Sequence, residues 1–221
     1  MQPQADPFIV PVCHDEIDIL YEDDALLLIN KPSGLLTLSG KHPANLDSVH
    51  YRLRQRYPDC RMLHRLDFGT SGVMLVALNK AINGLLTQQF QTGRVKKTYT
   101  AVLHGLLEAD NGVVELPIAK GDFPLQKICR ERGKTATTHF NVMRRSPEKN
   151  CTWVCFEPLS GRTHQLRIHS REMGHSILGC DLYANDEAYF MADRLMLHAT
   201  TLSFDHPVTG SVMIGESTCP F

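Results

Sequence analysis

The chain has 221 residues, of which 43% are hydrophobic and 21% are charged, and its formal net charge is −1 at pH 7. A chain of this length can bury a sizeable core in one domain. It has no secretory signal and no apolar run of roughly 20 residues, which argues against export or membrane insertion and predicts a cytoplasmic protein. The net charge argues against nonspecific coating of nucleic acid, and seven scattered cysteines, an odd number, predict reduced thiols.

The N-terminal segments predict an arm followed by a hairpin. Residues 1–16 hold three prolines and little periodicity, so we expect an extended arm. Residues 17–21 and 25–30 flank a Glu-Asp-Asp sequence, which is typical of a β-hairpin. The Lys-Pro-Ser-Gly sequence at 31–34 follows, and its proline and glycine predict a turn.

Two helices are expected in the next part of the chain. The first begins at a cap provided by the Asp-Ser pair at 47–48 and ends before Pro58, since proline cannot continue a helix. The second covers 80–92, where apolar residues recur at helical spacing, and it stops at Gly93.

The remaining segments mostly alternate in the manner of strands. One further helix is expected from the Gly-Arg-Thr sequence at 161–163 to about Met173. Strands are expected at 73–78, 96–106, 112–116, 137–143, 152–157, 195–204 and 211–214. Because strands outnumber helices and mostly follow one another directly, we predict an α+β fold with a mixed, largely antiparallel sheet and flanking helices.

Charge is unevenly distributed along the sequence. Acidic residues crowd the predicted hairpin, and basic residues gather at 94–97, 127–134, 144–145 and 162–171. Each basic cluster alone is typical of a solvated face. Together they permit a partner with a phosphate backbone, such as RNA.

Residues 64–72, His-Arg-Leu-Asp-Phe-Gly-Thr-Ser-Gly, form the most informative segment. They place Asp67 in a short polar loop directly before the apolar strand at 73–78. A loop anchored on a rigid strand is suited to hold a reactive group still. The alternative is that Asp67 closes a turn or pairs with Arg65 without any role in chemistry.

Four further segments combine basic and aromatic residues in recognisable order. They are Asn-Lys-Pro-Ser-Gly at 30–34, Arg-Val-Lys-Lys-Thr-Tyr at 94–99, Leu-Ser-Gly-Arg-Thr-His-Gln-Leu-Arg-Ile-His at 159–169, and Arg-Leu-Met-Leu-His-Ala at 194–199. In the order they occur, these segments and the loop at 64–72 resemble the motifs N-K-P-x-G, H-R-L-D-x-x-T-S-G, K-K-x-Y, T-G-R-x-H-Q-[LI]-R-x-H and R-L-x-L-H-A of the RluA-type pseudouridine synthases. The resemblance extends from about residue 17 to about residue 214 and departs from the family at Ser160, where the motif has threonine.

The resemblance implies catalytic roles for three residues. Asp67 takes the position of the aspartate that isomerises uridine in RNA. Tyr99 is expected to stack on the uracil and to help remove the C5 proton. Arg167 is expected to keep the Asp67 carboxylate charged and aimed through bidentate hydrogen bonds. Without the resemblance, Tyr99 reads as a half-buried strand aromatic and Arg167 as part of an exposed basic helix face.

The resemblance also implies residues that contact the substrate. Arg65 would fill the gap that a flipped nucleotide leaves in the RNA and touch phosphates, and Leu197 would line the uracil pocket, although Leu197 also reads as plain core. The other side chains expected to contact RNA are His64, Lys97, Arg162 and His164. The sequence His-Ser-Ile-Leu-Gly-Cys-Asp at 175–181 resembles the family's H-P-I-x-G-D but departs from it at two positions, so only a packing role is expected there.

What the resemblance implies for the whole chain is a pseudouridine-synthase-like catalytic domain over 17–221, with a central cleft and no separate N-terminal RNA-binding domain. The expected activity is isomerisation of uridines in structured RNA, namely 23S ribosomal RNA, the tRNA anticodon stem-loop, or both. The expected enzyme is a monomer without an obligatory protein partner. The isomerisation is redox-neutral, so no cofactor is expected, and either covalent addition of Asp67 to C1′ or a glycal intermediate remains open.

Metal-dependent and non-enzymatic alternatives are less well supported. His164 and His169 are five residues apart, which puts them on different sides of a helix, and Cys151 and Cys155 have no second pair at zinc-finger spacing. We therefore expect no metal site. A hydrolase using Asp67 lacks a second carboxylate at motif distance, and an inactive RNA-binding module would not need Asp67 together with its expected partners.

Overall fold

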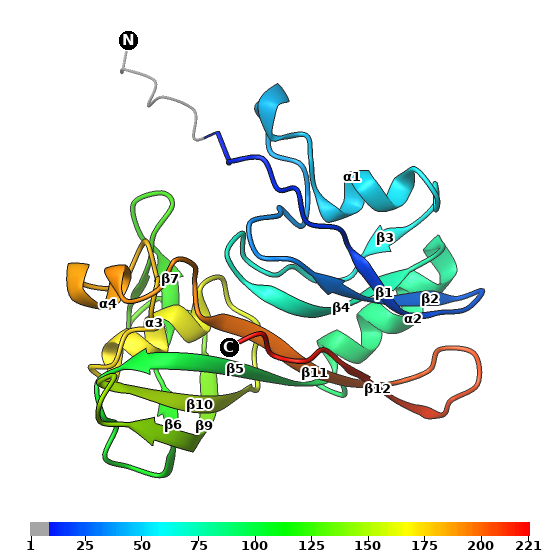
Figure 1. Cartoon of the computed structure of the whole chain (residues 1–221). Coiled ribbons are helices and arrows are strands. Elements are labelled where there is room, and N and C mark those ends of the chain that lie inside the picture. The colour runs from blue at the N-terminus through cyan, green and yellow to red at the C-terminus, as the bar shows by residue number, and fades with distance from the viewer. Residues whose placement is uncertain (1–8) are drawn as a thin grey trace.

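The computed structural model describes residues 9–221 (Figure 1). Their strands are β1 (Asp18–Glu22), β2 (Leu26–Lys31), β3 (Arg61–Met62), β4 (Ser71–Ala77), β5 (Lys96–His104), β6 (Asn111–Glu115), β7 (Ile118–Lys120), β8 (Gln126–Ile128), β9 (Thr137–Ser146), β10 (Cys151–Pro158), β11 (Leu197–Asp205) and β12 (Val212–Glu216). The helices are α1 (Val49–Arg54), α2 (Lys80–Gln91), α3 (Gln165–Glu172) and α4 (Asp186–Phe190), with a short 3₁₀ turn η1 (Pro43–Asn45).

A single large sheet organises the part of the chain that the structure describes. It has ten strands, eight of which follow the order β1-β2-β4-β11-β5-β10-β9-β6, while β12 pairs with β11 and β3 with β4. Every pairing is antiparallel except the one between β4 and β11. This confirms the predicted α+β class with a mixed, largely antiparallel sheet.

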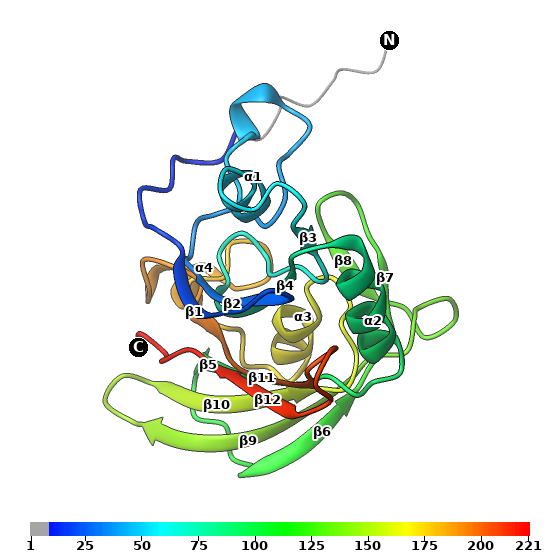
Figure 2. The same cartoon turned by 90° about the vertical axis from the view of Figure 1, so that its right-hand side faces the viewer.

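Two large clusters and one small cluster of buried residues form the hydrophobic core along this sheet. One large cluster packs β2 and β4 against α1 and α2 in one half of the structure, and the other large cluster packs β5 and β10 against α3 in the other half. Figure 1 shows the two halves side by side, with β11 between them, and Figure 2 shows the sheet of β5, β10 and β9 curving around α3. Tyr99 on β5 contacts both large clusters. The two halves therefore meet next to this strand.

The seam between the halves is the short parallel contact of β4 with β11. Two residue pairs form it, His198 with Ser71 and Ala199 with Gly72. Gly72 has a φ of +117°, and a Cβ built there would lie 2.2 Å from the carbonyl oxygen of Ala199. Because no side chain fits at that distance, a glycine is required for β4 and β11 to approach.

Most sequence-based elements are confirmed to within a few residues. The hairpin, the helices capped by Ser48 and by Asn79, and the seven predicted strands all occur. The short strands β3, β7 and β8 and the helix α4 were not predicted. Residues 9–16 of the expected arm have no regular secondary structure, whereas residues 1–8 of that arm lie outside the described residues.

The N-terminal segment is tied to α1 rather than extended into solvent. Arg52 donates to the carbonyl oxygens of Cys13 at 2.5 Å and Asp15 at 2.6 Å, and it also forms an ion pair with Asp47 at 2.6 Å. No helix within residues 9–221 is both long and apolar enough to cross a membrane.

Two glycine substitutions test the importance of the seam. Gly72→Ala should lower the free energy of unfolding by more than about 3 kcal/mol, since a strained backbone alone costs about 1–3 kcal/mol and the overlap with Ala199 adds to it. Gly84→Ala, in α2 with nothing within 4 Å of the added carbon, should instead stabilise by about 0.5–1 kcal/mol. Denaturant unfolding of both variants measures the contrast, and a Gly72→Ala protein as stable as the wild type would show that the seam tolerates a side chain.

Candidate active site

Side chains of residues 31–37 fix the loop that carries Asp67 through hydrogen bonds to its main chain. Thr37 Oγ1 donates to the carbonyl oxygen of Leu66 at 2.8 Å and accepts from its N–H at 3.2 Å. Ser33 Oγ donates to the carbonyl oxygen of Gly69 at 2.7 Å. The loop is thus held on both sides of Asp67 by a turn that precedes it by about thirty residues in the sequence.

A buried lysine, Lys31, also supports the loop that carries Asp67. Lys31 has no exposed surface, and its ammonium donates to the carbonyl oxygens of Pro32 at 2.8 Å, Leu35 at 2.7 Å and Phe68 at 3.3 Å. Burial lowers the pKa of Lys31 to about 7, against which the negative charge of Asp67 acts. The three carbonyls hold the charge in place, and one of them belongs to the residue after Asp67.

His64 accepts a hydrogen bond from the edge of β4 that also pairs with β3 and β11. On that edge β3 pairs with Val76 and Ala77, and β11 pairs with Ser71 and Gly72. The N–H of Leu75 lies between these pairings and donates to His64 Nε2 at 3.1 Å. Burial lowers the pKa of His64 to about 3, and the positive charge of Lys97 acts in the same direction. The ring is therefore neutral and has a structural partner, in addition to the RNA contact expected from the sequence.

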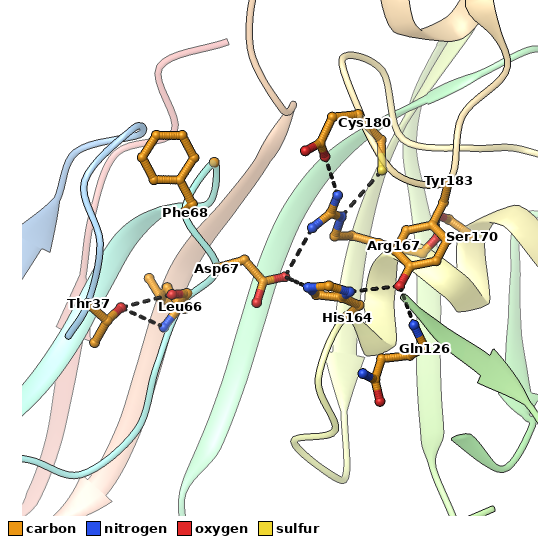
Figure 3. A network of polar contacts seen from close by, with 12 residues as sticks. Thr37, Leu66, Asp67, Phe68, Gln126, His164, Arg167, Ser170, Cys180 and Tyr183 are labelled. Atoms are coloured by element: carbon orange, nitrogen blue, oxygen red, sulfur yellow. Dashed lines mark hydrogen bonds and ion pairs between the residues drawn. The ribbon is translucent and has the colours of Figure 1, made fainter. Parts of the chain in front are cut away.

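The Asp67 carboxylate points across the seam toward α3 (Figure 3). Its Oδ2 lies 3.6 Å from Arg167 Nη1 and 3.9 Å from His164 Nε2. Asp67 comes from the N-terminal half and its two partners from the C-terminal half. The site consequently exists only when both halves are assembled.

The expected bidentate hydrogen bonds between Arg167 and Asp67 are not formed. Arg167 is 5% exposed, and its other two nitrogens bind different groups. Nη2 pairs with the Asp181 carboxylate, and Nε donates to Cys180 Sγ at 3.3 Å. The Asp67 contact is a single longer ion pair. The expectation of a packing role alone at 175–181 is wrong, because Asp181 and Cys180 hold the arginine that faces Asp67.

The helix α3 begins later than the sequence suggested. It starts at Gln165, and His164 before it is in the left-handed region with a φ of +57°. The side-chain amide of Gln165 accounts for this: its oxygen accepts from Ser160 Oγ at 2.8 Å and from the N–H of Arg162 at 3.0 Å, so it fixes the loop before the helix. Arg167 is consequently not on a helix face shared with His164, and it is buried rather than exposed on a basic face.

A cavity of about 510 Å³ opens in front of Asp67. Its lining includes Asp67, Tyr99 and Leu197 together with the cationic side chains Arg65, Lys97, Arg162 and Arg167, and it also includes His64 and His164. All nine site residues expected from the sequence therefore line one cavity. In residues 9–221, Asp67 is the single carboxylate among the lining side chains, so the cavity favours an anionic ligand.

The side chains around the cavity differ in how they are held. Leu197 is buried on β11, and Tyr99 enters the cavity from the neighbouring strand β5. Burial, together with the charge of Asp67, raises the pKa of Tyr99, so its hydroxyl is protonated at neutral pH. Arg65 is exposed and forms no hydrogen bond or ion pair with the rest of residues 9–221, so the alternative pairing of Arg65 with Asp67 is not present.

The residues considered for metal binding lie apart. His169 is buried and bonded to Thr138 Oγ1 at 2.9 Å and to the Leu116 carbonyl at 3.0 Å, which ties α3 to β9. All seven cysteines are free thiols. Within residues 9–221 no group of three or more histidine, cysteine or acidic side chains could hold a metal ion.

Sequence reasoning missed four residues that organise the site. Lys31, Gln165 and Asp181 are described above, and the fourth is Tyr183, whose hydroxyl lies 2.7 Å from His164 Nδ1. Lys31 and Gln165 lie inside segments that the motif comparison had already marked. Asp181 ends the segment 175–181, for which only a packing role was expected, and Tyr183 lies outside every marked segment; the roles of both depend on contacts with α3.

Comparison with known proteins gives consistent likenesses. The profile of the family described as RNA pseudouridylate synthase matches residues 25–172. The dual-specificity RNA pseudouridine synthase RluA of Yersinia pestis is 45% identical over 88% of this chain and 95% of that protein. The protein of the same name from Escherichia coli strain K12 is 40% identical over 99% of this chain and 97% of that protein.

Solved structures extend the likeness to the fold. The human protein RNA Pseudouridylate Synthase Domain Containing 1 superposes with a TM-score of 0.80 at 29% identity, covering 96% of this chain and 86% of the other. A second human protein, RNA Pseudouridylate Synthase Domain Containing 4, has a TM-score of 0.74 at 24% identity, covering 92% of this chain and 88% of the other, and supports the fold alone.

The low pKa of His64 predicts how stability changes with pH. Between pH 7 and pH 5 the unfolded chain protonates this histidine, whose ordinary pKa is about 6.5, while the folded protein does not. The stability that neutral His64 contributes is therefore fully present above about pH 6.5 and is lost as the pH falls toward 3. This one group accounts for a loss of about 2 kcal/mol by pH 5.

His64→Gln removes this titration while keeping an acceptor for the N–H of Leu75. The variant should lose about 2 kcal/mol less stability than the wild type between pH 7 and pH 5. Urea unfolding at the two pH values measures the difference. Equal losses in both proteins would show that His64 protonates freely in the folded state.

Proposed function

The chain belongs to the RluA-type pseudouridine synthase family and is an isomerase that converts uridine in RNA to pseudouridine, and from this premise we propose that Asp67 is its catalytic carboxylate. The observation that carries the proposal is the position of Asp67. Within residues 9–221 it is the one carboxylate that lines the cavity, and it faces a buried arginine. The loop that holds it is fixed by side chains of residues 31–37.

The reaction breaks the N1–C1′ bond, turns the uracil, and joins C5 to C1′. Asp67 takes part at the ribose, either by adding to C1′ or by removing a ribose proton to give a glycal. Arg167 balances the charge of the carboxylate during these steps. Atoms are conserved and no electrons are exchanged, so the chemistry calls for no cofactor.

The detached base needs a slot that holds it while it turns. Tyr99 and Leu197, on adjacent strands, provide aromatic and aliphatic walls to the cavity beside Asp67. The raised pKa of Tyr99 keeps its phenol protonated, which favours a stacking role for Tyr99 over that of a free phenolate base. The walls also exclude water from a base that is no longer covalently attached.

RNA is held by the cationic rim of the cavity. Lys97, Arg162 and Arg65 line the cavity, and the Arg65 guanidinium has no hydrogen-bond or ion-pair partner among residues 9–221. A paired or stacked uridine must leave the helix to reach Asp67, at a cost of a few kcal/mol. We assign to Arg65 the space that the flipped nucleotide vacates, with contacts to the neighbouring phosphates.

Structured RNA is the proposed substrate class, with 23S ribosomal RNA and the tRNA anticodon stem-loop as targets. Relatives that cover nearly the whole chain bear the name dual-specificity RNA pseudouridine synthase, which supports more than one target. We further propose that residues 17–221 act as one catalytic domain, as a cytoplasmic monomer that reads RNA with its own surface. Mapping pseudouridines in RNA from cells with and without the protein identifies the target uridines.

Replacing the proposed catalytic carboxylate should abolish the reaction. Asp67→Asn preserves volume and removes the charge, so turnover of a verified RNA should fall by more than about a thousandfold while RNA affinity changes little. The matched control Asp59→Asn alters an exposed carboxylate in the turn before β3 and should retain full activity. Single-turnover assays measure both, and a residual Asp67→Asn rate within about tenfold of the wild type would refute the assignment.

The role of Arg65 is tested by comparing two RNAs. Arg65→Ala should weaken productive binding of a structured stem-loop more than that of a flexible single strand, since a vacancy is costly only in the structured RNA. The salt dependence of affinity should become shallower by about one unit, as expected when one phosphate contact is lost.

Arg61→Ala provides the matched control for Arg65. Arg61 is also exposed, four residues earlier on β3, and does not line the cavity. The control should behave as the wild type on both RNAs. Equal losses on stem-loop and single strand in Arg65→Ala, with an unchanged salt slope, would rule out the flipping role.

A further inference from the structure

The two groups that face the Asp67 carboxylate approach the same oxygen. Arg167 Nη1 is 3.6 Å and His164 Nε2 is 3.9 Å from Oδ2. Both groups therefore converge on the carboxylate of a residue that lines the cavity.

The second nitrogen of His164 is held by a tyrosine from a different segment. Tyr183, which is 6% exposed, has its hydroxyl 2.7 Å from His164 Nδ1 and accepts a hydrogen bond from the N–H of Gln126 at 2.9 Å. The guanidinium groups of Arg167 and Arg171 lie 5.2 and 5.6 Å from the centre of its ring. Figure 3 shows Tyr183 between His164 and Gln126.

These contacts decide which nitrogen of His164 carries the proton. The N–H of Gln126 occupies one lone pair of the Tyr183 oxygen, so the hydroxyl hydrogen is available to a second partner. Among the described residues the acceptor within reach is His164 Nδ1. A protonated Nδ1 would leave the hydroxyl hydrogen without an acceptor among the described residues, which favours an unprotonated Nδ1 and a hydrogen on Nε2, facing the Asp67 carboxylate.

We propose that Tyr183 is a positioning residue that holds His164 as its Nε2–H tautomer, so that His164 and Arg167 together orient the Asp67 carboxylate. The inference rests on the proposed catalytic role of Asp67. At 3.9 Å the His164 contact is longer than a hydrogen bond, and such contacts shorten when substrate closes the site. The opposite tautomer would direct a lone pair at a negative charge.

The surroundings keep His164 neutral. Burial lowers the pKa of the imidazole; Asp67 and Asp181 act against this effect, and the positive charges of Arg167 and Arg65 add to it. Its remaining polar neighbour is the uncharged Tyr183 hydroxyl. His164 therefore acts as a neutral donor.

The tautomer can be observed without any assay of activity. In protein with ¹⁵N-labelled histidine, long-range ¹H–¹⁵N correlation spectra at pH 7.5 distinguish Nδ1–H, Nε2–H and imidazolium forms. The His164 signal is identified as the one that disappears in His164→Gln. The wild type should show Nε2–H, and Tyr183→Phe should shift the signal toward Nδ1–H or a mixture. A wild-type Nδ1–H tautomer or imidazolium would overturn the inference, whatever the role of Asp67.

Kinetic measurements test the consequence for Asp67. Tyr183→Phe should lower the single-turnover rate about tenfold or more while KM for RNA stays within about twofold, because the change acts on orientation and not on binding. Tyr189→Phe, at an exposed tyrosine on α4, is the matched control and should leave both constants unchanged. A rise in KM with an unchanged rate in Tyr183→Phe would contradict the proposal.

Two replacements of His164 separate its nitrogens. His164→Gln places an amide near the Nε2 position and should retain a larger share of the rate than His164→Asn, whose amide reaches only the Nδ1 position. Thermal unfolding checks that both variants fold. The reverse order of rates in folded variants would show that the Nδ1 side carries the function.

Discussion

The close approach of β4 to β11 is the constraint on which the site depends. It brings the loop of Asp67, at the start of β4, against α3 and the segment that follows it. Gly72 permits the approach, since the carbonyl oxygen of Ala199 occupies the place of a side chain. Asp67 and Arg167 are a hundred residues apart in the sequence, and they meet because the sheet is continuous across this seam.

Two buried basic side chains show how the chain stabilises charge near the reaction centre. Lys31 and Arg167 are almost completely removed from water, which costs several kcal/mol for each ion when it is left uncompensated. Lys31 is compensated by three carbonyl oxygens, whereas Arg167 is shared between Asp181 and Asp67. The first arrangement fixes the backbone of the catalytic loop, and the second fixes the position of its carboxylate. Both put a fixed basic side chain beside a carboxylate that must stay ionised.

The sequence specifies local features better than distant ones. The strand after Asp67, the Ser48 cap and the end of α2 follow from residues within a few positions, and each was predicted. The start of α3 was placed too early because the Gln165 amide fixes the loop before the helix, and this amide is itself held by bonds to Thr137 and Thr138 across the fold. The roles of Asp181 and Tyr183 were missed for the same reason, since contacts with α3 define them. Motif resemblance located all nine expected site residues around one cavity, but not the network that orients them.

The central claim is that the uridine leaves its RNA helix and presents C1′ to residue 67. A crystal structure of the Asp67→Asn protein bound to a target stem-loop measures this directly. The account predicts a flipped uridine with its uracil between Tyr99 and Leu197, and with C1′ about 3–3.5 Å from the side chain of residue 67. A uridine that stays stacked in the stem, or one that enters the cavity with C1′ turned away from residue 67, would contradict it.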